Sequence, residues 1–350
     1  MDSLAHALKI SPEFYPHSLD LVSDAVSFIR LAEQDYAAAS FLDARILTPG
    51  GAMETVGWPV VQRAVAQDAL PERLGLIFHI GHVGSTLLSR LLGAHPGVLA
   101  LREPDPLRTL ARMHADLDAP GGPWEQAHFD ARLETLLRLW SRTFRPGQTA
   151  VVKATSFCCG LAQAILTRPS RPRVIFIFTR PEVYLATLFG GENNHLDIGA
   201  SADLRARRLD DRLGGAVADL ATMRYAQVAA MSWACEMTAL ADAAAAAPGQ
   251  ALWLDFERLL LRPQARLAEA FAHLGVAAGD DEIAAIVAGP ELNRYSKAPE
   301  HAYDANLRAQ VLDQARTHHG AMIAEGLSWL DRAAGDHPAV AAALNLGGGI

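Results

Sequence analysis

The chain has 350 residues, half of them apolar and a fifth charged, so it is long enough to bury a sizeable core. The formal charge of −8 argues against nucleic acid as a partner, because nucleic-acid-binding domains usually carry a basic stripe. No basic segment followed by an apolar stretch opens the chain, and no apolar run approaches the roughly 18 residues of a membrane span. The three cysteines, Cys158, Cys159 and Cys235, lack metal-site spacing and are typical of buried packing residues. These features predict a soluble, cytoplasmic protein without a membrane span.

Lysine is scarce in this chain. Of the 31 basic side chains, only Lys9, Lys153 and Lys297 are lysine, and the rest are arginine. A lysine that persists in an arginine-rich sequence indicates a place that needs a compact ammonium group rather than a planar guanidinium group.

In chain order, residues 1–74 show helix-like patterning, as in LDLVSDAVSFIRLAEQDYAAASFL, and predict a mostly helical N-terminal extension. From Leu76 the pattern changes to short apolar runs rich in β-branched and aromatic residues, namely LIFHI, VLAL, TAVVKA, RVIFIF and ALWLDF. Helix-like segments separate these runs: STLLSRLLGA, DPLRTLARMHADL, ARLETLLRLWSRTF, PEVYLATLFG and the stretch near 221–247. Apolar strands that alternate with helices predict an α/β fold, a three-layer α/β/α domain over residues 75–335 with a central parallel sheet.

The remaining segments are less regular. The part from Pro263 onward is predicted to be helical, and residues 336–350, which end in LNLGGGI, are predicted to form a loose tail. Residues 191–215 are polar and charged without clear periodicity, which fits either a mobile lid or a solvated insertion. We find no internal repeat.

A short glycine-containing loop in LIFHIGHVGSTLLSRLL is typical of an anion-binding site. Gly81, Gly84, Ser85 and Thr86 lie between an apolar strand and a helix. Glycines permit backbone angles that turn several N–H groups inward, and the helix N-terminus adds partial positive charge. A tight strand-to-helix turn with a Ser/Thr cap would give the same pattern, so the loop alone leaves both interpretations open.

The loop lacks the lysine of nucleotide-hydrolysing loops, whose pattern is G-x-x-x-x-G-K-[ST]. Here Gly84 is followed directly by Ser85. The strand RVIFIF, which could supply a magnesium-binding aspartate, ends instead in Thr179 and Arg180. Both absences disfavour triphosphate chemistry, which depends on that lysine and the metal, and favour a donor that needs no metal.

These residues resemble the 5′-phosphosulfate loop of the sulfotransferases that use 3′-phosphoadenosine 5′-phosphosulfate (PAPS). The family's loop consists of a basic residue followed by Ser, Gly, Thr or Ser, and Thr. The residues at these five positions are, in the same order, His82, Val83, Gly84, Ser85 and Thr86. Further segments resemble the family in the expected order: HPGVLALREP, VVKAT, VIFIFTRPEVYLAT, the span around Trp233, and LWLDFERLLLRPQARLAEAFAHLGV. The likeness covers roughly residues 76–276. It implies a P-loop NTPase-like fold of the sulfotransferase type, PAPS as the donor, and no metal.

The sequence departs from the family pattern in two places. His82 stands where Arg or Lys is usual. In the 3′-phosphate motif, alignment on Pro181 puts Thr179 at the family's Arg, leaves Arg180 one place later, and puts Thr187 on the family's Ser. Both departures concern donor affinity and activity more than the fold.

Sulfuryl transfer needs a base for the acceptor proton and positive charge where the leaving oxygen becomes negative. Glu103 follows the strand VLAL at its carboxyl end, where open parallel sheets bind ligands, and is the candidate base; a structural ion pair with Arg102 or a surface carboxylate is the alternative. A buried ammonium group without a partner is costly, so we expect Lys153, which follows AVV, to reach the sulfonate or bridging oxygen. When protonated, His82 is expected to supply further positive charge; a hydrogen-bonding spacer is the alternative. Asp105 fits an N-cap of the next helix better than a base.

The remaining donor contacts are assigned by the resemblance. Arg180 and Thr187 are expected to hold the 3′-phosphate, about two turns apart on a helix that begins at Pro181. Lys297, in the polar loop NRYSKAPEHAYD, is expected to close over the donor.

The sequence therefore predicts a metal-independent sulfotransferase that moves a sulfuryl group from PAPS to a hydroxyl or amine. The acceptor is a small molecule, lipid, peptide or saccharide, and the sequence leaves its identity and the oligomeric state open. Two alternatives remain: a P-loop small-molecule kinase, which would need a magnesium-binding carboxylate and a phosphate lysine, and a non-catalytic nucleotide-binding module.

Overall fold

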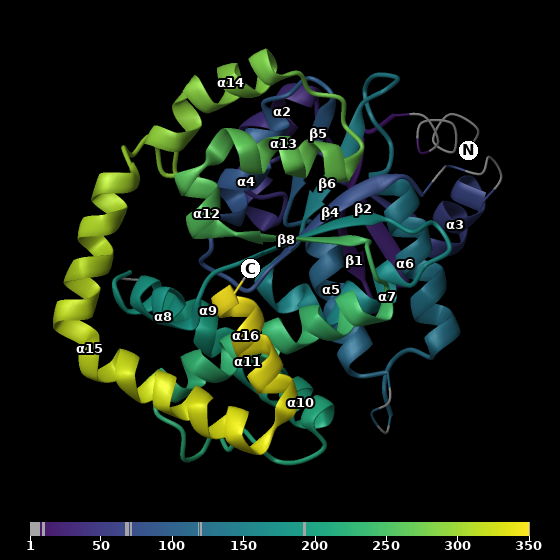
Figure 1. Cartoon of the computed structure of the whole chain (residues 1–350). Coiled ribbons are helices and arrows are strands. Elements are labelled where there is room, and N and C mark those ends of the chain that lie inside the picture. Colours follow the sequence, from purple (N-terminus) through teal and green to yellow (C-terminus); the bar gives the residue numbers. More distant parts are fainter. Residues whose placement is uncertain are drawn as a thin grey trace.

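The computed structural model describes residues 8, 11–66, 70, 72–117, 119, 121–191 and 194–349 (Figure 1). Its centre is a five-stranded sheet of order β5-β6-β4-β7-β8, in which all neighbouring strands are parallel. The strands are β4 (Leu74–His79), β5 (Val98–Arg102), β6 (Thr149–Lys153), β7 (Arg173–Phe178) and β8 (Ala251–Asp255). The five strands match the five apolar runs of the sequence, so the predicted fold class, α/β with a central parallel sheet, is confirmed.

Helices cover both faces of this sheet, which explains why its strands are apolar throughout rather than alternating. α4 (Ser85–Gly93) packs on β4 and β5, and α13 (Pro263–Leu274) packs on β7, β8 and α4. In Figure 1 these two helices lie above β8, and α5 (Asp105–Ala115), α7 (Ala162–Leu166) and α11 (Tyr225–Ala246) lie below it. The carboxyl end of β4 therefore opens between two helical layers.

The remaining helical elements connect or extend these layers. They are α2 (Glu33–Ala38), η1 (Ala44–Ile46), α3 (Trp58–Ala66), α6 (Gln126–Trp140), η2 (Ser156–Leu161), α8 (Pro181–Phe189), α9 (Asn194–Ala200), α10 (Ala202–Leu213), α12 (Phe256–Leu261), α14 (Asp280–Ala288), η3 (Pro290–Asn293), α15 (Ala305–Asp336) and α16 (Pro338–Gly349). Asp105 is the first residue of α5 rather than its N-cap, which is Pro104. Pro181 begins α8, as predicted.

The N-terminal segment contains a second sheet, so the prediction of a mostly helical extension over residues 1–74 is wrong. Three antiparallel strands pair in the order β1 (Phe14–Asp20), β2 (Ala25–Arg30) and β3 (Glu54–Gly57). β1 and β2 are buried over most of their length, so neither shows the alternation that marks a half-exposed strand. The turn between the two strands contains Leu21 and Val22, which are 45% and 99% exposed. Together with the apolar residues of the strands, these two residues give the apolar spacing of a helix.

The C-terminal residues form a packed helix, so the prediction of a loose tail over residues 336–350 is also wrong. α16 packs on α11 and α15, and its Val340 and Ala343 are fully buried. A Cβ atom at Gly347 would lie 3.0 Å from the ring of Trp233, so the glycine permits a close approach there. Glycines disfavour an isolated helix, but tertiary contacts override that local preference here.

The polar segment 191–215 is mostly helical and is fastened to the core through buried charges. Arg205 and Arg208 of α10 are buried and pair with the fully buried Glu236 of α11 at 2.8 and 3.0 Å. Arg205 also donates a hydrogen bond of 3.0 Å to Ser156 Oγ in η2. Because arginines take core positions on α10, the apolar periodicity that would have indicated a helix was absent. The α10 part of this segment is therefore anchored to the core.

The cysteines are packing residues, as the sequence suggested. All three are buried and free, and burial raises the pKa of the Cys158 thiol to about 12. None of the helices in the described part of the chain combines the length and hydropathy needed to cross a bilayer.

Candidate active site

The loop between β4 and α4 has the backbone geometry of an anion-binding site. Gly81, His82 and Gly84 have positive φ angles of 93°, 53° and 67°. Left-handed residues interspersed with ordinary ones direct neighbouring N–H groups to one side, where an anion can bind them. α4 begins at Ser85 and has no side-chain cap, so the N–H groups of its first turn are available to a ligand.

The hydroxyl of Thr86 adds a second sign of a ligand. Thr86 Oγ1 is buried and has no hydrogen-bond partner among the described residues, and Thr86 lines the cavity described below. An unsatisfied buried hydroxyl costs about 1–3 kcal/mol, which an oxyanion accepting its hydrogen bond would offset. The loop residues therefore fit a bound oxyanion.

Gly84 is required by its surroundings as well as by its φ angle. A Cβ atom there would lie 2.0 Å from Cε2 of Phe256, far inside van der Waals contact. Phe256 follows directly after β8 and is buried, so either its ring or the loop would have to shift to admit the Cβ atom. The loop and the end of β8 are therefore fitted to each other at this position.

His79, the last residue of β4, supports the loop from below. The Gly81 N–H donates a hydrogen bond of 3.1 Å to His79 Nδ1, and His79 Nε2 lies 2.9 Å from the carbonyl oxygen of Ala154. Since Nδ1 accepts, Nε2 carries the proton and donates to Ala154. The N–H of Gly81 is thus engaged within the protein, and Gly81 does not line the cavity. This hydrogen bond gives Gly81 a role in shaping the loop, and its direct contact with the donor stays a prediction.

Glu103 and Lys153 form an ion pair at the carboxyl ends of two adjacent strands. The register pairs Arg102 of β5 with Lys153 of β6, so Glu103 emerges beside Lys153, and its N–H donates to the Lys153 carbonyl at 2.7 Å. Glu103 has a φ of 55°, which is unusual for a residue with a side chain. The Lys153 ammonium donates directly to Glu103 Oε1, and Thr155 Oγ1 lies 3.4 Å from Oε2. The alternative pairing of Glu103 with Arg102 is wrong, because Arg102 donates instead to carbonyl groups of the α2 region.

The ammonium group of Lys153 is held in an environment that disfavours its charge. Its side chain is 1% exposed, and burial lowers the pKa of Lys153 below the ordinary value of 10.5. The charge of Glu103 raises this pKa in part, while Lys297 and Arg102 lower it further. Such an ammonium gains from any additional negative charge placed beside it.

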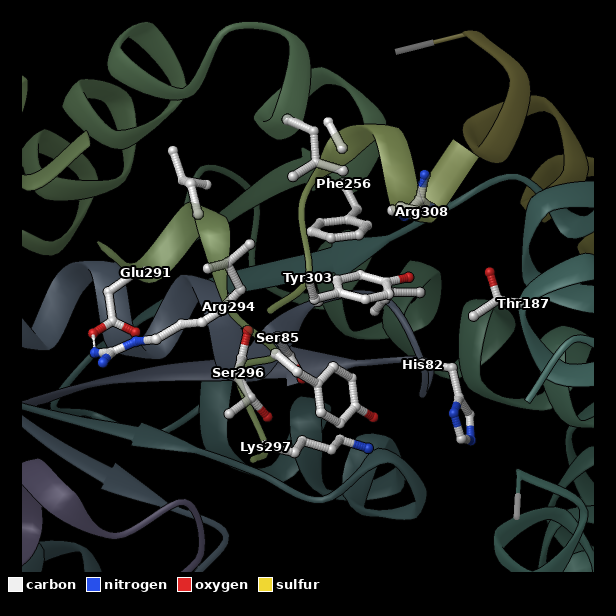
Figure 2. A pocket seen from close by; sticks show the side chains of 18 of the residues that line it. His82, Ser85, Thr187, Phe256, Glu291, Arg294, Ser296, Lys297, Tyr303 and Arg308 are labelled. Carbon is white, nitrogen blue, oxygen red and sulfur yellow. Dashed lines mark hydrogen bonds and ion pairs between the residues drawn. The ribbon is translucent and has the colours of Figure 1, made fainter. Parts of the chain in front are cut away.

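The loop, the ion pair and the C-terminal segments enclose a cavity of about 440 Å³ (Figure 2). Nine of the eleven predicted site residues line it: His82, Val83, Gly84, Ser85, Thr86, Glu103, Lys153, Thr187 and Lys297. In Figure 2, Lys297 and His82 extend toward the same part of the cavity. Lys153 and Lys297, two of the three lysines, thus occur at this site, and Lys9 lies outside the described residues.

Arg180 is the predicted residue that the structure does not bring to the others. Its side chain is exposed and does not line the cavity. Thr179, the alternative residue of the same motif, is buried, and its carbonyl accepts a hydrogen bond of 3.1 Å from Trp233 Nε1. Of the predicted 3′-phosphate contacts, only Thr187 lies on the cavity wall.

Several cavity residues were missed by the sequence analysis. Arg308, near the start of α15, lines the cavity, pairs with Glu257 at 2.5 Å, and lies over the ring of Phe256 at 5.1 Å. Tyr303 and Tyr295 also line it and contact each other edge to face. Phe256 follows the carboxyl end of a strand, as Glu103 does. Because parallel sheets bind ligands at the carboxyl ends of their strands, the sequence pattern that indicated Glu103 also indicates Phe256. No local sequence pattern around Arg308 indicates that this residue lines a cavity.

The polar loop that carries Lys297 lies over the cavity, where the sequence analysis expected a closing segment. Its Ser296 carbonyl accepts a hydrogen bond of 2.7 Å from Nε of Arg90, a residue of α4. A bridge between Arg294 and Ala302 closes the base of the loop. The described part of the chain contains no group of three or more His, Cys, Asp or Glu side chains arranged to hold a metal ion.

No protein-family model and no curated protein matches the chain. Solved structures similar to the chain include three sulfotransferases or sulfotransferase domains. The sulfotransferase domain from the curacin biosynthetic pathway is 17% identical, with a TM-score of 0.39, and the match covers 74% of this chain and 98% of that domain. The domain from the Synechococcus PCC 7002 olefin synthase is 16% identical with a TM-score of 0.38, covering 70% and 94%. A sulfotransferase from Alicyclobacillus acidocaldarius is 15% identical with a TM-score of 0.34, covering 74% and 94%.

Proposed function

We propose that the protein transfers a sulfuryl group from PAPS to a hydroxyl or amine of an acceptor without a metal ion. One observation carries the proposal. A carboxylate and an ammonium group, Glu103 and Lys153, line the same cavity as an anion-binding loop that has no phosphate lysine of its own. This combination supplies an acid–base group and a positive charge beside a bound oxyanion, which are the two requirements of sulfuryl transfer.

Each residue has a defined task in this proposal. The N–H groups of the first turn of α4 and the Thr86 hydroxyl bind the 5′-phosphosulfate end of the donor. Glu103 accepts the acceptor's proton while a bond forms between the acceptor atom and sulfur. The bond between sulfur and the bridging phosphate oxygen breaks in the same step, and Lys153 and protonated His82 stabilise the negative charge left on that oxygen. Before the donor binds, Lys153 contacts Glu103; the donor's charge draws the ammonium toward the bridging oxygen and releases the carboxylate.

Calorimetry with the product 3′-phosphoadenosine 5′-phosphate (PAP) tests the proposal against its alternatives. PAP should bind in the presence of a chelator, and ATP·Mg²⁺ should not displace it. Transfer of labelled sulfate from PAPS to an acceptor mixture should then be detectable. A preference for ATP·Mg²⁺ would instead indicate a kinase, and tight PAP binding without transfer to any acceptor would indicate a non-catalytic module.

The 3′-phosphate is expected to lie between Thr187 and Arg308, which both line the cavity. We therefore expect Arg308→Gln to weaken PAP binding by about tenfold or more, since a charge-assisted hydrogen bond contributes about 1.5–3 kcal/mol. Binding of adenosine 5′-phosphate, which lacks the 3′-phosphate, should change little. The matched variant is Arg180→Gln, which removes the arginine that the sequence motif pointed to. If this variant loses the 3′-phosphate preference and Arg308→Gln keeps it, the assignment reverts to Arg180.

The pH dependence of kcat/KM should report the buried lysine. Lys153 must be protonated to stabilise the leaving oxygen, so activity is present below its pKa and is lost as pH rises through it. Because burial lowers the pKa of Lys153, the alkaline fall should lie below the ordinary lysine value of 10.5. The His82→Ala variant should keep this alkaline fall and lose any fall in the neutral range. Activity that stays constant up to pH 10.5 would exclude Lys153 from this role.

A further inference from the structure

Three arginines beside Glu103 take no part in the mechanism above. Arg45 lies in η1, and Arg108 and Arg112 lie one turn apart on α5; we call these three the basic cluster. Arg45 Nη2 is 3.8 Å from Glu103 Oε2, so the cluster begins at the candidate base. None of the three lines the donor cavity. Glu103 thus lies between the cavity on one side and the basic cluster on the other.

The cluster is held together by two shared partners. Asp43 accepts hydrogen bonds from Arg45, and its Oδ2 lies 3.4 Å from Nη1 of Arg108. The guanidinium groups of Arg108 and Arg112 each lie 5.6 Å from the ring centroid of Phe157. Burial alone would raise the pKa of Asp43, but the hydrogen bonds and charge of Arg45 and the charge of Arg108 lower it, so this carboxylate stays ionised and keeps Arg45 in place.

The cluster carries more positive than negative charge, although the whole chain has a net charge of −8. Among the described residues, its ion pairs involve only Asp43 and Glu103, and Glu103 is already paired with Lys153. Three guanidinium groups against Asp43 leave an excess of two positive charges. Arg112 is exposed and has no ion pair with any described residue. The side chains of Arg45 and Arg108 are 53% and 29% exposed, so a ligand can reach all three.

We propose that the acceptor carries an anionic group, a carboxylate or a phosphate, that binds the basic cluster while its hydroxyl or amine lies at Glu103. Guanidinium groups bind both anions through paired hydrogen bonds, which suits them to this task. An anion hydrogen-bonded to Arg45 would lie within ~7 Å of the Glu103 carboxylate, given the 3.8 Å between the two side chains and a hydrogen bond of about 2.8 Å. This inference rests on the proposed sulfuryl transfer, because it takes Glu103 as the site of the accepting group.

Matched pairs of charged and neutral probes test this inference. 4-Hydroxyphenylacetate is compared with 4-hydroxyphenylacetamide, and glycerol 3-phosphate with glycerol, by saturation-transfer NMR and calorimetry on the full chain with and without PAP. We expect at least one anionic probe to bind about tenfold or more tightly than its neutral partner. The two pairs distinguish a carboxylate from a phosphate as the preferred group.

Variants of the basic cluster test whether its arginines cause the preference for the anionic probe. The triple variant Arg45→Gln, Arg108→Gln, Arg112→Gln should lose the preference for the anionic probe, and Arg112→Gln alone, at an exposed position without an ion pair, should weaken anion binding about threefold. Arg332→Gln, an exposed arginine of α15, is the matched control and should change nothing. PAP affinity should be the same in all variants.

The outcomes separate this inference from the proposed function. If the wild-type chain does not bind PAP, the proposed function fails, whatever the probes show. If PAP binds but the neutral probes bind as tightly as the anionic ones, the inference about the acceptor is overturned. It is overturned equally if the preference survives in the triple variant and in Arg112→Gln, or if no probe binds at millimolar concentration.

Discussion

Replacing Lys153 by methionine is expected to lower the rate of sulfuryl transfer by about 10²–10³-fold, the usual effect of removing one group that stabilises a developing oxyanion. It should also lower the free energy of unfolding by about 3 kcal/mol, because Glu103 would remain as a largely buried carboxylate that keeps only the more distant Arg45, at 3.8 Å, as a charged neighbour among the described residues. The steady-state rate and the denaturant midpoint of the same variant measure both effects.

The double variant Glu103→Gln, Lys153→Met separates catalysis from stability. It removes both charges, so most of the lost stability should return, because replacing both members of a buried pair costs far less than breaking it. The rate should stay low, since the base is also gone and a general base contributes about 10²–10⁴-fold. If the rate recovers along with the stability, the pair is structural and the proposed chemistry is wrong.

The second large effect is expected at Gly84. In Gly84→Ala the new Cβ atom would meet the Phe256 ring at 2.0 Å, and the φ of 67° is unfavourable for alanine. The loop or the ring must move, and both line the cavity. We expect the loss of two charge-assisted hydrogen bonds of about 1.5–3 kcal/mol each, which corresponds to at least a hundredfold weaker binding of PAP. Calorimetry with PAP measures the loss.

Gly249→Ala is the matched control for this substitution. Gly249 has a φ of 77° and no atom within 4 Å of the position that a Cβ would take. It therefore reports the conformational cost alone, about 1–2 kcal/mol of stability, with PAP binding unchanged. Equal losses of stability and PAP affinity in the two variants would show that the contact with Phe256 does not hold the loop.

The sheet could be predicted because its strands carry a strong local signal. β7 is buried over most of its length and framed by turn residues, so its composition alone marks it. Composition did not identify β1 and β2, because their apolar residues continue into an exposed turn and the combined apolar spacing resembles that of a helix. It failed again for α10, because Arg205 and Arg208 are buried by pairing with Glu236, and no periodicity reveals a partner 28 or more residues away.

The site residues likewise divide into those predictable from local sequence and those that depend on contacts between distant segments. Glu103 and Lys153 were predictable because the carboxyl ends of neighbouring parallel strands meet at one edge of the sheet. Their direct ion pair could not be predicted, because it depends on the register between β5 and β6. Arg308 reaches the cavity from a helix that begins more than 200 residues after the loop, and the packing of α15 on α8 and α11 brings it there.

The most direct test of the account is a crystal structure with PAP bound in the presence of a chelator. We expect the 5′-phosphate within about 3 Å of the N–H groups at the start of α4 and of Thr86 Oγ1, with no metal ion between them. A nucleotide bound elsewhere, or binding that requires Mg²⁺, would contradict it.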